Sequence, residues 1–265
     1  MFPSTPWSAQ QYVKFEDERT RPVRDLLNAV PLGKAHRVID VGCGPGNSTE
    51  LLRARFPEAM VSGIDSSPDM IEAARQRLPD VAFEVADAST WQGTDRYDVI
   101  LANAVFQWLP DHEHLFPRLL GRLTPGGVLA VQMPDNLDEP AHTLLRDVAA
   151  QAPWTERLRG AERSVRHSPE WYYALLSAHG AKVDVWRTTY HHPLPGGIDA
   201  VIEWFKGSAL RPVLSRLDAE EGEVFLARYR AALDAAYPTL PNGTVLLPFP
   251  RLFVVATAGC SIRAK

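Results

Sequence analysis

A glycine-rich turn and three nearby carboxylates are the residues of this chain best suited to chemistry. An apolar run, Arg37 to Val41, leads into the turn Gly42-Cys43-Gly44-Pro45-Gly46, and a helical pattern follows the turn. Such a unit opens many nucleotide-binding α/β sheets, where glycines let the backbone approach a ligand. Asp40 lies at the entrance of the turn, and Asp65 and Asp87 end the next two apolar runs. Three acids at one sheet edge favour a ligand with cationic or hydroxyl groups and disfavour a pyrophosphate.

The positions of these acids narrow the choice of cofactor. Asp65 lies where a dinucleotide-binding sheet carries its ribose-binding acid, so its spacing does not separate NAD from S-adenosylmethionine. Two residues favour the second cofactor: Asp40, and Asn47, which stands where the dinucleotide pattern has a third small residue. S-adenosylmethionine carries a sulfonium, an amino group and a ribose, and no phosphate. Asp87 suits a hydrogen bond to the adenine amino group.

Four segments resemble the successive motifs of class I S-adenosylmethionine-dependent methyltransferases: residues 38–46, 63–67, 86–88 and 123–127. Four further segments resemble a narrower branch of this family whose members methylate a carboxylate of trans-aconitate: residues 7–22, 102–112, 132–136 and 204–212. The resemblance spans nearly the whole chain, from Trp7 to about Ala258. Its second half is the more specific, because all class I methyltransferases share the first.

The resemblance implies residues for each ligand. For S-adenosylmethionine these are Asp40, Gly42, Gly44, Asp65, Ser66, Met70, Asp87, Ala88 and Asn103. For the acid they are Tyr12, Gln107, Trp108, Lys206, Arg211 and Arg251. Arg211 and Arg251 are the stronger cation candidates, because apolar and proline residues flank both, and an arginine in such surroundings is usually turned inward or paired.

The chemistry expected at this site needs no catalytic side chain. A carboxylate is already ionised at pH 7, and the sulfonium methyl is already activated. We therefore expect no general base and no metal; catalysis should depend on orientation, on loss of water from the carboxylate and on paired arginines. The stretch Asp111-His112-Glu113-His114 is better explained as the start of a helix than as a metal site.

The elements that position these residues alternate between strand and helix. Strands are expected at 37–41, 60–64, 81–85, 97–102, 127–132, 183–190 and 245–256, and helices at 10–30, 48–55, 69–77 and 112–121. This alternation predicts a Rossmann-like α/β fold with a mostly parallel, seven-stranded sheet. Residues 191–193 are expected to form a loop. Helical segments within 1–30, 139–165 and 198–236 exceed what the sheet needs, and we expect them to form a cap or lid on a single domain, 1–265.

Composition sets limits on partners and location. The chain has 265 residues, 45% of them hydrophobic and 23% charged, with a net charge of −4. This balance indicates an ordinary globular enzyme and gives no signal for binding nucleic acid. No apolar run approaches the ~20 residues of a membrane span, and the start lacks the pattern of a secretion signal. Two cysteines are read as reduced thiols, so a cytoplasmic location is expected.

Three alternatives stay open at this level. The enzyme could act on another acid, such as a malonyl group on a carrier protein, although a basic docking patch is not evident. A non-catalytic S-adenosylmethionine-binding module should have lost pocket residues, whereas Asp40, Asp65 and Asp87 are all present. A nicotinamide-dependent dehydrogenase is the weakest reading. The sequence does not indicate which carboxyl is methylated or the oligomeric state.

Overall fold

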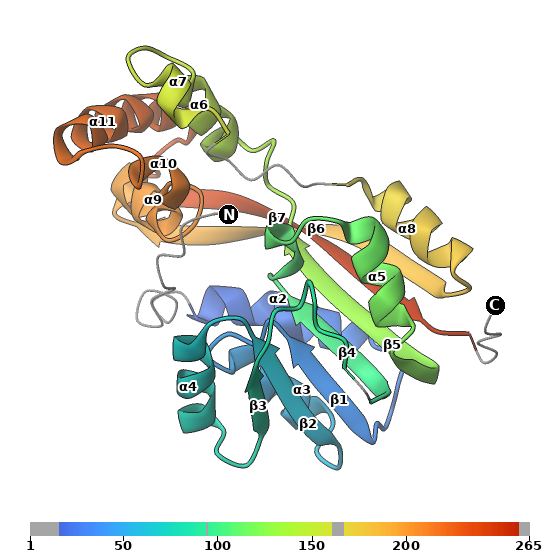
Figure 1. Ribbon diagram of the computed structural model, residues 1–265. Coiled ribbons are helices and arrows are strands. Elements are labelled where there is room, and N and C mark those ends of the chain that lie inside the picture. Colours follow the sequence, from blue (N-terminus) through green and yellow to red (C-terminus); the bar gives the residue numbers. More distant parts are fainter. Residues whose placement is uncertain (1–15, 94, 161–166, 260–265) are drawn as a thin grey trace. The chain divides into compact units, whose positions relative to one another are not determined.

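The computed structural model describes residues 16–93, 95–160 and 167–259. Its seven strands form one sheet in the order β3-β2-β1-β4-β5-β7-β6 (Figure 1). The strands are β1 Arg37–Val41, β2 Met60–Asp65, β3 Ala82–Val85, β4 Tyr97–Asn103, β5 Leu123–Pro134, β6 Lys182–Pro195 and β7 Thr244–Thr257. The neighbours from β3 to β5 are all parallel. The predicted seven-stranded, mostly parallel sheet is therefore confirmed.

β7 runs antiparallel to β5. The backbone of Gly127 accepts from Ala258 N at 2.8 Å, and Asp135 N donates to Pro250 O at 2.9 Å. Residue numbers rise on one strand as they fall on the other, which is the pairing of an antiparallel ladder. The carboxyl ends of β1, β2 and β4 nevertheless share one edge, because these strands are mutually parallel.

Helices cover both faces of the sheet. The helices are α2 Glu16–Ala29, α3 Asn47–Arg55, α4 Pro68–Arg77, α5 His112–Leu120, α6 Pro140–Ala149, α7 Thr155–Leu158, α8 Pro169–Ala178, α9 Gly197–Lys206, α10 Arg211–Leu214 and α11 Ala219–Ala236, with a 3₁₀ turn, η1, at Phe106–Trp108. In Figure 1, α5 and α8 lie in front of the sheet, and α2 and α3 lie behind it. On the face that α5 covers, α5 and the strands form one buried core cluster.

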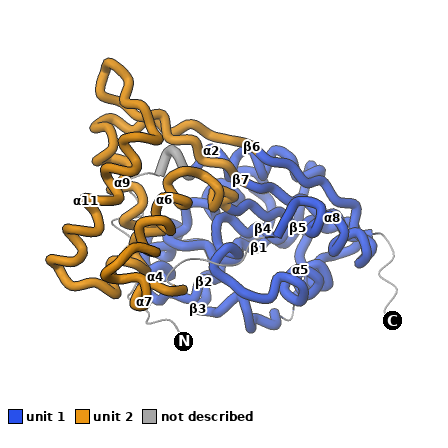
Figure 2. Tube along the Cα trace, turned by 90° about the horizontal axis from the view of Figure 1, so that it is seen from above, with its two compact units in different colours: residues 1–133, 165–187, 252–265 blue, residues 134–164, 188–251 orange. Residues whose placement is uncertain are grey.

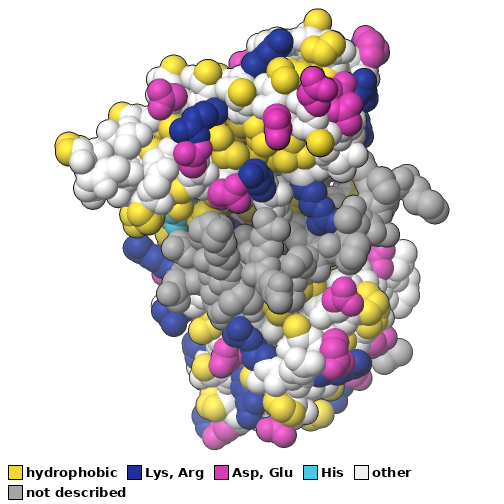
Figure 3. All heavy atoms as spheres, turned by 90° about the vertical axis from the view of Figure 1, so that its left-hand side faces the viewer, with side chains coloured by type: hydrophobic (Ala, Val, Ile, Leu, Met, Phe, Trp, Pro, Cys, Tyr) yellow, Lys and Arg dark blue, Asp and Glu magenta, His cyan; other side chains and the backbone are white. Residues whose placement is uncertain are grey.

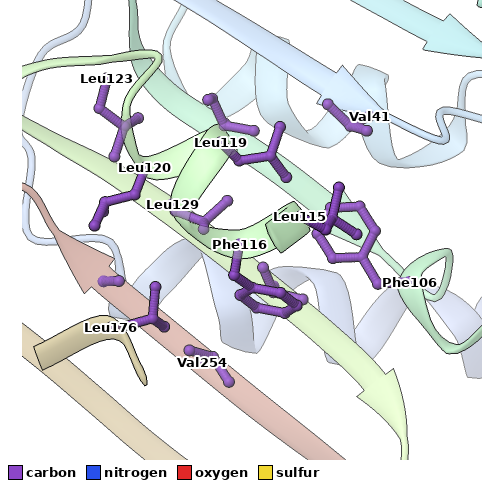
Figure 4. Packing of buried hydrophobic residues seen from close by; sticks show 14 of the residues in the cluster. Val41, Phe106, Leu115, Phe116, Leu119, Leu120, Leu123, Leu129, Leu176 and Val254 are labelled. Carbon is purple, nitrogen blue, oxygen red and sulfur yellow. The ribbon is translucent and has the colours of Figure 1, made fainter. Parts of the chain in front are cut away.

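The core on this face follows from the two periodicities of strand and helix. Leu115, Phe116 and Leu119 of α5 recur at helical spacing and point at the sheet, where Leu129 faces them (Figure 4); Ile100 belongs to the same cluster. All five side chains are at most 4% exposed. Each such residue contributes about 1.5–3 kcal/mol by leaving water. This packing gives the loops at the strand ends a rigid base.

Contacts divide the chain into two compact units (Figure 2). Unit 1 comprises residues 1–133, 165–187 and 252–265, and unit 2 comprises residues 134–164 and 188–251. Unit 2 contains most of two predicted cap segments, 139–165 and 198–236. Inside it α6 and α11 are joined by hydrogen bonds: Tyr229 Oη donates to Ala141 O at 2.6 Å, and Tyr237 Oη accepts from Ala141 N at 3.0 Å. That these segments act as a lid on a single domain stays a prediction.

Three sequence predictions differ from the structure. β5 starts at Leu123 rather than at residue 127: Leu123 pairs with Tyr97 of β4, and Gly126 and Gly127 bond to the backbone of Ala258, which directly follows β7. β6 continues through the expected loop at 191–193. His192 and Leu194 are buried while His191 and Pro193 are exposed, which is the alternation of a strand. The helical stretch expected within 139–165 is divided into two helices, α6 and α7.

Candidate functional site

The glycine-rich turn at the end of β1 adopts left-handed backbone angles that glycine tolerates best. Gly42, Gly44 and Gly46 have φ values of 74°, 54° and 91°. Gly42 N and Cys43 N donate to Ile64 O at 2.8 and 2.9 Å, which ties the turn to β2. A Cβ at Gly42 would meet Val105 Cγ2 at 2.3 Å, whereas a Cβ at Gly44 would meet no described atom within 4 Å. The turn therefore packs tightly on one side and leaves open space beside Gly44.

Asp65 bridges the turn and the start of α4. Its Oδ2 accepts from Gly44 N and its Oδ1 from Ser67 N, both at 2.9 Å. Burial raises the pKa of Asp65, while these backbone N–H groups oppose that rise by favouring the charged form. Each oxygen keeps a lone pair, so a carboxylate held in this way can still accept hydrogen bonds from two vicinal hydroxyls.

Asp40 lies beneath the turn and is completely buried. Its Oδ2 accepts from Ser48 Oγ and Thr49 Oγ1, both at 2.7 Å, which ties β1 to the first turn of α3. Its Oδ1 has no hydrogen-bond partner among the described residues. Burial is the main cause that raises the pKa of Asp40 to about 6. Only Oδ1 remains to face a ligand, so the geometry gives Asp40 a structural task besides the predicted electrostatic one.

Asp87 and Ala88 lie on a loop held by a residue that sequence reasoning missed. Asp87 is exposed, and its Oδ1 accepts from Ser89 N at 2.8 Å, which leaves Oδ2 accessible. Arg118 of α5 donates to Ala88 O at 2.7 Å and to Trp91 O at 3.2 Å. Its position 30 residues away in the chain gives no sequence signal for this role. Of the other predicted cofactor residues, Ser66 is exposed, and Met70 is buried in the first turn of α4, where its N–H is capped by Ser67.

A second turn follows β4. Asn103 Oδ1 accepts from Gln132 Nε2 at 2.5 Å, and Ala104 adopts a φ of 53° that is unusual for a residue with a Cβ. Gln107 Nε2 donates to Ala104 O at 2.6 Å. A carbonyl can only accept a hydrogen bond, so the atom of Gln107 that bonds to Ala104 O is Nε2. The other amide atom, Oε1, is buried without a partner among the described residues. In this rotamer Gln107 holds the turn, and its nitrogen would have to leave Ala104 to bind an acid.

The turns at the ends of β1 and β4 lie in direct contact, because the space above Gly42 is filled by the Val105 side chain. Trp108, at the end of η1, is 42% exposed. The structure thus brings the predicted residues Asp40, Gly42, Gly44, Asp65, Asn103 and Gln107 to one edge of the unit 1 sheet. Tyr12 lies outside the described residues.

The predicted cations of unit 2 differ in their surroundings. Lys206, in the last turn of α9, forms a surface ion pair with Glu203. Arg211 begins α10 and is half-buried. Arg251 is 4% exposed, and its guanidinium lies 4.8 Å from the centre of the Phe249 ring. Phe249 also packs against His192 and Trp204. Arg251 is therefore a buried cation in an aromatic environment, where a charged group requires compensation.

Two searches of the described residues bear on other site types. No group of three or more His, Cys, Asp or Glu residues in those ranges is placed to hold a metal ion. Within the same ranges, no helix has the length and apolar character to cross a membrane.

Comparison with known proteins decides the family. Residues 15–185 match the model of a methyltransferase domain. A trans-aconitate 2-methyltransferase of Methylobacterium nodulans is 56% identical over 94% of this chain and 97% of its own, and one of Rhizobium etli is 51% identical over 96% and 99%. The chain belongs to the trans-aconitate 2-methyltransferase family. Its cofactor is S-adenosylmethionine, as expected for this family.

Solved structures agree on the fold. The YcgJ protein of Bacillus subtilis has a TM-score of 0.60 and 16% identity, covering 90% of this chain and 98% of its own. A phosphoethanolamine methyltransferase of Haemonchus contortus, in complex with S-adenosylhomocysteine, has a TM-score of 0.55 and 16% identity over 90% of this chain and 53% of its own. At this identity the likeness shows the Rossmann-like fold alone.

Proposed function

We propose that this chain transfers the methyl group of S-adenosylmethionine to a carboxylate oxygen of trans-aconitate. The observation that carries the proposal is the identity above 50% with trans-aconitate 2-methyltransferases over more than nine tenths of the chain, unit 2 included. The products are the monomethyl ester and S-adenosylhomocysteine: an oxygen–carbon bond forms as the sulfur–carbon bond breaks, and the sulfur keeps the electron pair.

The donor set around the glycine-rich turn fits the cofactor. Asp65 presents two oxygens beside the open space at Gly44, which suits the ribose hydroxyls. Asp87 presents an accessible oxygen that suits an adenine amino group, and Asn103 ends β4 where the methionine portion would lie. Acids rather than cations line this edge, which suits a ligand without phosphate. These assignments of single residues are proposals.

The chain's own residues have a limited chemical task. S-adenosylmethionine supplies a methyl group on a positively charged sulfur, so the acceptor needs no base to activate it. The protein must orient one carboxylate in line with that methyl, remove its water and neutralise the remaining carboxylates. We propose Arg251 and Arg211 for the neutralisation, and Gln107 and Trp108 for orientation of the reacting carboxylate. Lys206 would have to share its charge with Glu203, with which it forms an ion pair.

The runner-up is a methyltransferase for an acid carried by a protein, such as a malonyl group. Such an enzyme needs a basic surface for an acidic carrier. On the face shown in Figure 3, the described Lys and Arg side chains are interspersed with Asp and Glu. This mixed surface favours a free acid.

The state of Cys43 is compatible with a cytoplasmic enzyme. Burial raises the pKa of its thiol, which keeps the thiol unreactive.

The test is methyl transfer from labelled S-adenosylmethionine to a panel of acceptors: trans-aconitate, cis-aconitate, isocitrate, citrate and malonyl-carrier protein. The proposal predicts turnover that strongly prefers trans-aconitate. Tight binding of the cofactor without transfer to any free acid would contradict it. The variant Arg251→Gln should retain cofactor affinity and raise the KM for trans-aconitate by about tenfold, since a charged hydrogen bond is worth about 1.5 kcal/mol or more.

A further inference from the structure

A buried histidine and a buried tyrosine lie directly behind η1. His112, the first residue of α5, turns its imidazole into the core and is 1% exposed. Its Nε2 lies 2.8 Å from Phe106 O, and its Nδ1 lies 2.6 Å from Tyr172 Oη. Tyr172 is on α8 and is 2% exposed. Two side chains 60 residues apart thus reach one carbonyl of η1 through a continuous pair of hydrogen bonds.

The chemistry of the partners fixes the protons. A carbonyl can only accept, so Nε2 carries the proton that is donated to Phe106 O. Nδ1 of the neutral ring then accepts from the Tyr172 hydroxyl. Burial is the main cause that lowers the pKa of His112, and the neighbouring His167 lowers it further; the backbone hydrogen bonds with Phe106 and Leu109 and the charge of Asp111 oppose this shift. The rings of Phe116, Tyr172 and His167 enclose the imidazole, so the neutral tautomer is the stable form at neutral pH.

The turn that these bonds hold is strained at both ends. Ala104 and Asp111 adopt φ values of 53° and 62°, and neither is a glycine. A left-handed conformation costs Ala104 about 1–2 kcal/mol, and it costs Asp111 less, because aspartate adopts this region more readily. It persists only where surrounding contacts fix the backbone. Gln107 Nε2 fixes Ala104 O at one end, and His112 Nε2 fixes Phe106 O in the middle, where Leu109 N donates as well.

We propose that Tyr172 and His112 are positioning residues for methyl transfer, because they set the place of η1 and, through it, of Gln107 and Trp108. Neither side chain needs to touch the substrate; both act through Phe106 O. This inference rests on the proposed function, in which Gln107 and Trp108 orient the acid. A displacement of about 1 Å at an orienting group can lower the rate by as much as 10²-fold.

The experiment removes one oxygen. Tyr172→Phe deletes the hydroxyl that orients His112 and leaves the ring packing in place. Tyr97→Phe is the matched control: it removes the hydroxyl of a buried tyrosine in the same core cluster, bonded to Ser62, at the opposite end of β4. For each variant the measurements are kcat and KM for trans-aconitate, the Kd for S-adenosylhomocysteine and the thermal midpoint.

We expect Tyr172→Phe to lower kcat/KM for trans-aconitate by about tenfold, with the cofactor Kd changed less than twofold. Tyr97→Phe should lose comparable stability and keep wild-type kinetics. His112→Gln, whose amide can donate to Phe106 O, should retain more activity than His112→Leu. Equal kinetics for Tyr172→Phe and Tyr97→Phe would overturn the proposal and leave Tyr172 a purely structural residue.

A second readout does not depend on the reaction. The amides of Trp108 and Leu109 donate within η1, to Val105 O and Phe106 O. Their hydrogen exchange should accelerate in Tyr172→Phe and stay unchanged in Tyr97→Phe. If the wild-type enzyme fails to methylate trans-aconitate while this exchange pattern appears, the proposed substrate fails and the positioning of η1 stands. Unchanged exchange in Tyr172→Phe contradicts the positioning itself.

Discussion

The turns that follow β1 and β4 lie at the same edge of the unit 1 sheet, and their left-handed backbone angles are stabilised in two different ways. Both must bend the backbone through left-handed angles beside a ligand. The first uses glycines at 42, 44 and 46, for which such angles cost little. The second uses Ala104 and Asp111, and holds them with the side chains of Gln107, His112 and Tyr172. The glycines of the first turn adopt these angles readily, whereas contacts with surrounding side chains hold the second turn in them.

This difference separates what each turn can do. A glycine-rich turn exposes backbone and leaves room for a cofactor common to a whole superfamily. A turn fixed by side chains carries functional groups of its own, here Gln107 and Trp108. Such a turn suits a site that must discriminate between methyl-accepting substrates. The two turns meet where the Val105 side chain fills the space over Gly42. The contact predicts that a change in one can be transmitted to the other.

Gly42→Ala should have the largest effect. The new Cβ would lie 2.3 Å from Val105 Cγ2, and alanine would have to adopt a φ of 74°. Overpacking and left-handed strain together cost the folded protein about 4 kcal/mol of stability. The displaced glycine-rich turn should lower kcat/KM by about 100-fold or more. Gly44→Ala adds only the strain of a φ of 54° to the free protein and should destabilise it less, although its Cβ would enter the space proposed for the cofactor. Thermal unfolding of the free proteins measures this difference, and steady-state kinetics with both substrates measures the loss of kcat/KM.

The double variant Gly42→Ala/Val105→Ala sharpens this test. Removing the valine methyl groups relieves the overlap and should recover part of the loss. If the double variant is no better than Gly42→Ala, the contact between the two turns does not cause the defect.

Asp65→Asn should weaken the cofactor next most strongly. The amide would turn an N–H group toward either Gly44 N or Ser67 N, so one backbone donor loses its acceptor. One ribose hydroxyl would lose its charged partner as well. We expect the Kd for S-adenosylhomocysteine to rise by about 100-fold, measured by calorimetry, with the thermal midpoint of the free protein lowered only slightly. A change below threefold would remove Asp65 from the ribose site.

Asp40 should give unit 1 a distinctive pH dependence. Its pKa of about 6 lies above the value of 3.8 expected for the unfolded chain, so the folded state binds the extra proton. Its contribution to stability is complete below pH 3.8 and is lost as the pH rises through 6. Between pH 5 and pH 8 this loss amounts to about 1.4 kcal/mol.

Asp40→Asn should abolish that part of the pH dependence while its oxygen still accepts from Ser48 and Thr49. Urea unfolding of wild type and variant at the two pH values measures it. An identical pH dependence in both proteins would show that Asp40 is ionised without penalty.

Ala104→Gly should have the smallest effect and the opposite sign. Glycine adopts the φ of 53° without strain, although it gains freedom in the unfolded chain, so the net gain in stability stays within about 1 kcal/mol. If η1 is held by its surroundings, kinetics should change less than twofold. A loss of stability instead would show that Ala104 is not strained.

The comparison of the two turns also explains how far the sequence could predict the site. The alternation of strands and helices, the glycine-rich turn and the positions of Asp65 and Asp87 follow from local patterns, since glycines and strand-end acids mark their own conformations. Arg118, His112 and Tyr172 gave no such signal, because each acts on a loop through contacts 6 to 60 residues away. His112 begins α5, as the sequence predicts, yet its buried partners give no sequence signal.

The extended strands show the same limit. The strand predicted from residue 127 starts at Leu123 instead, because Leu123 pairs with Tyr97 of β4 and the backbone of Gly126 and Gly127 bonds to Ala258, just after β7. Residues 191–193 read as a loop, and only burial of His192 against Trp204 and Phe249 reveals the strand. Tertiary contacts set the bounds of both strands, β5 and β6, against the local sequence preference.

The most direct test of the account is one crossed measurement on Asp65→Asn and Gln107→Leu: the Kd for S-adenosylhomocysteine and the KM and kcat for trans-aconitate at saturating cofactor. The account predicts that Asp65→Asn raises the Kd and leaves the acid parameters near wild type. It predicts that Gln107→Leu leaves the Kd unchanged and impairs the acid parameters by about tenfold or more. If both variants change the same parameters by similar factors, the two turns do not divide the work between cofactor and acid.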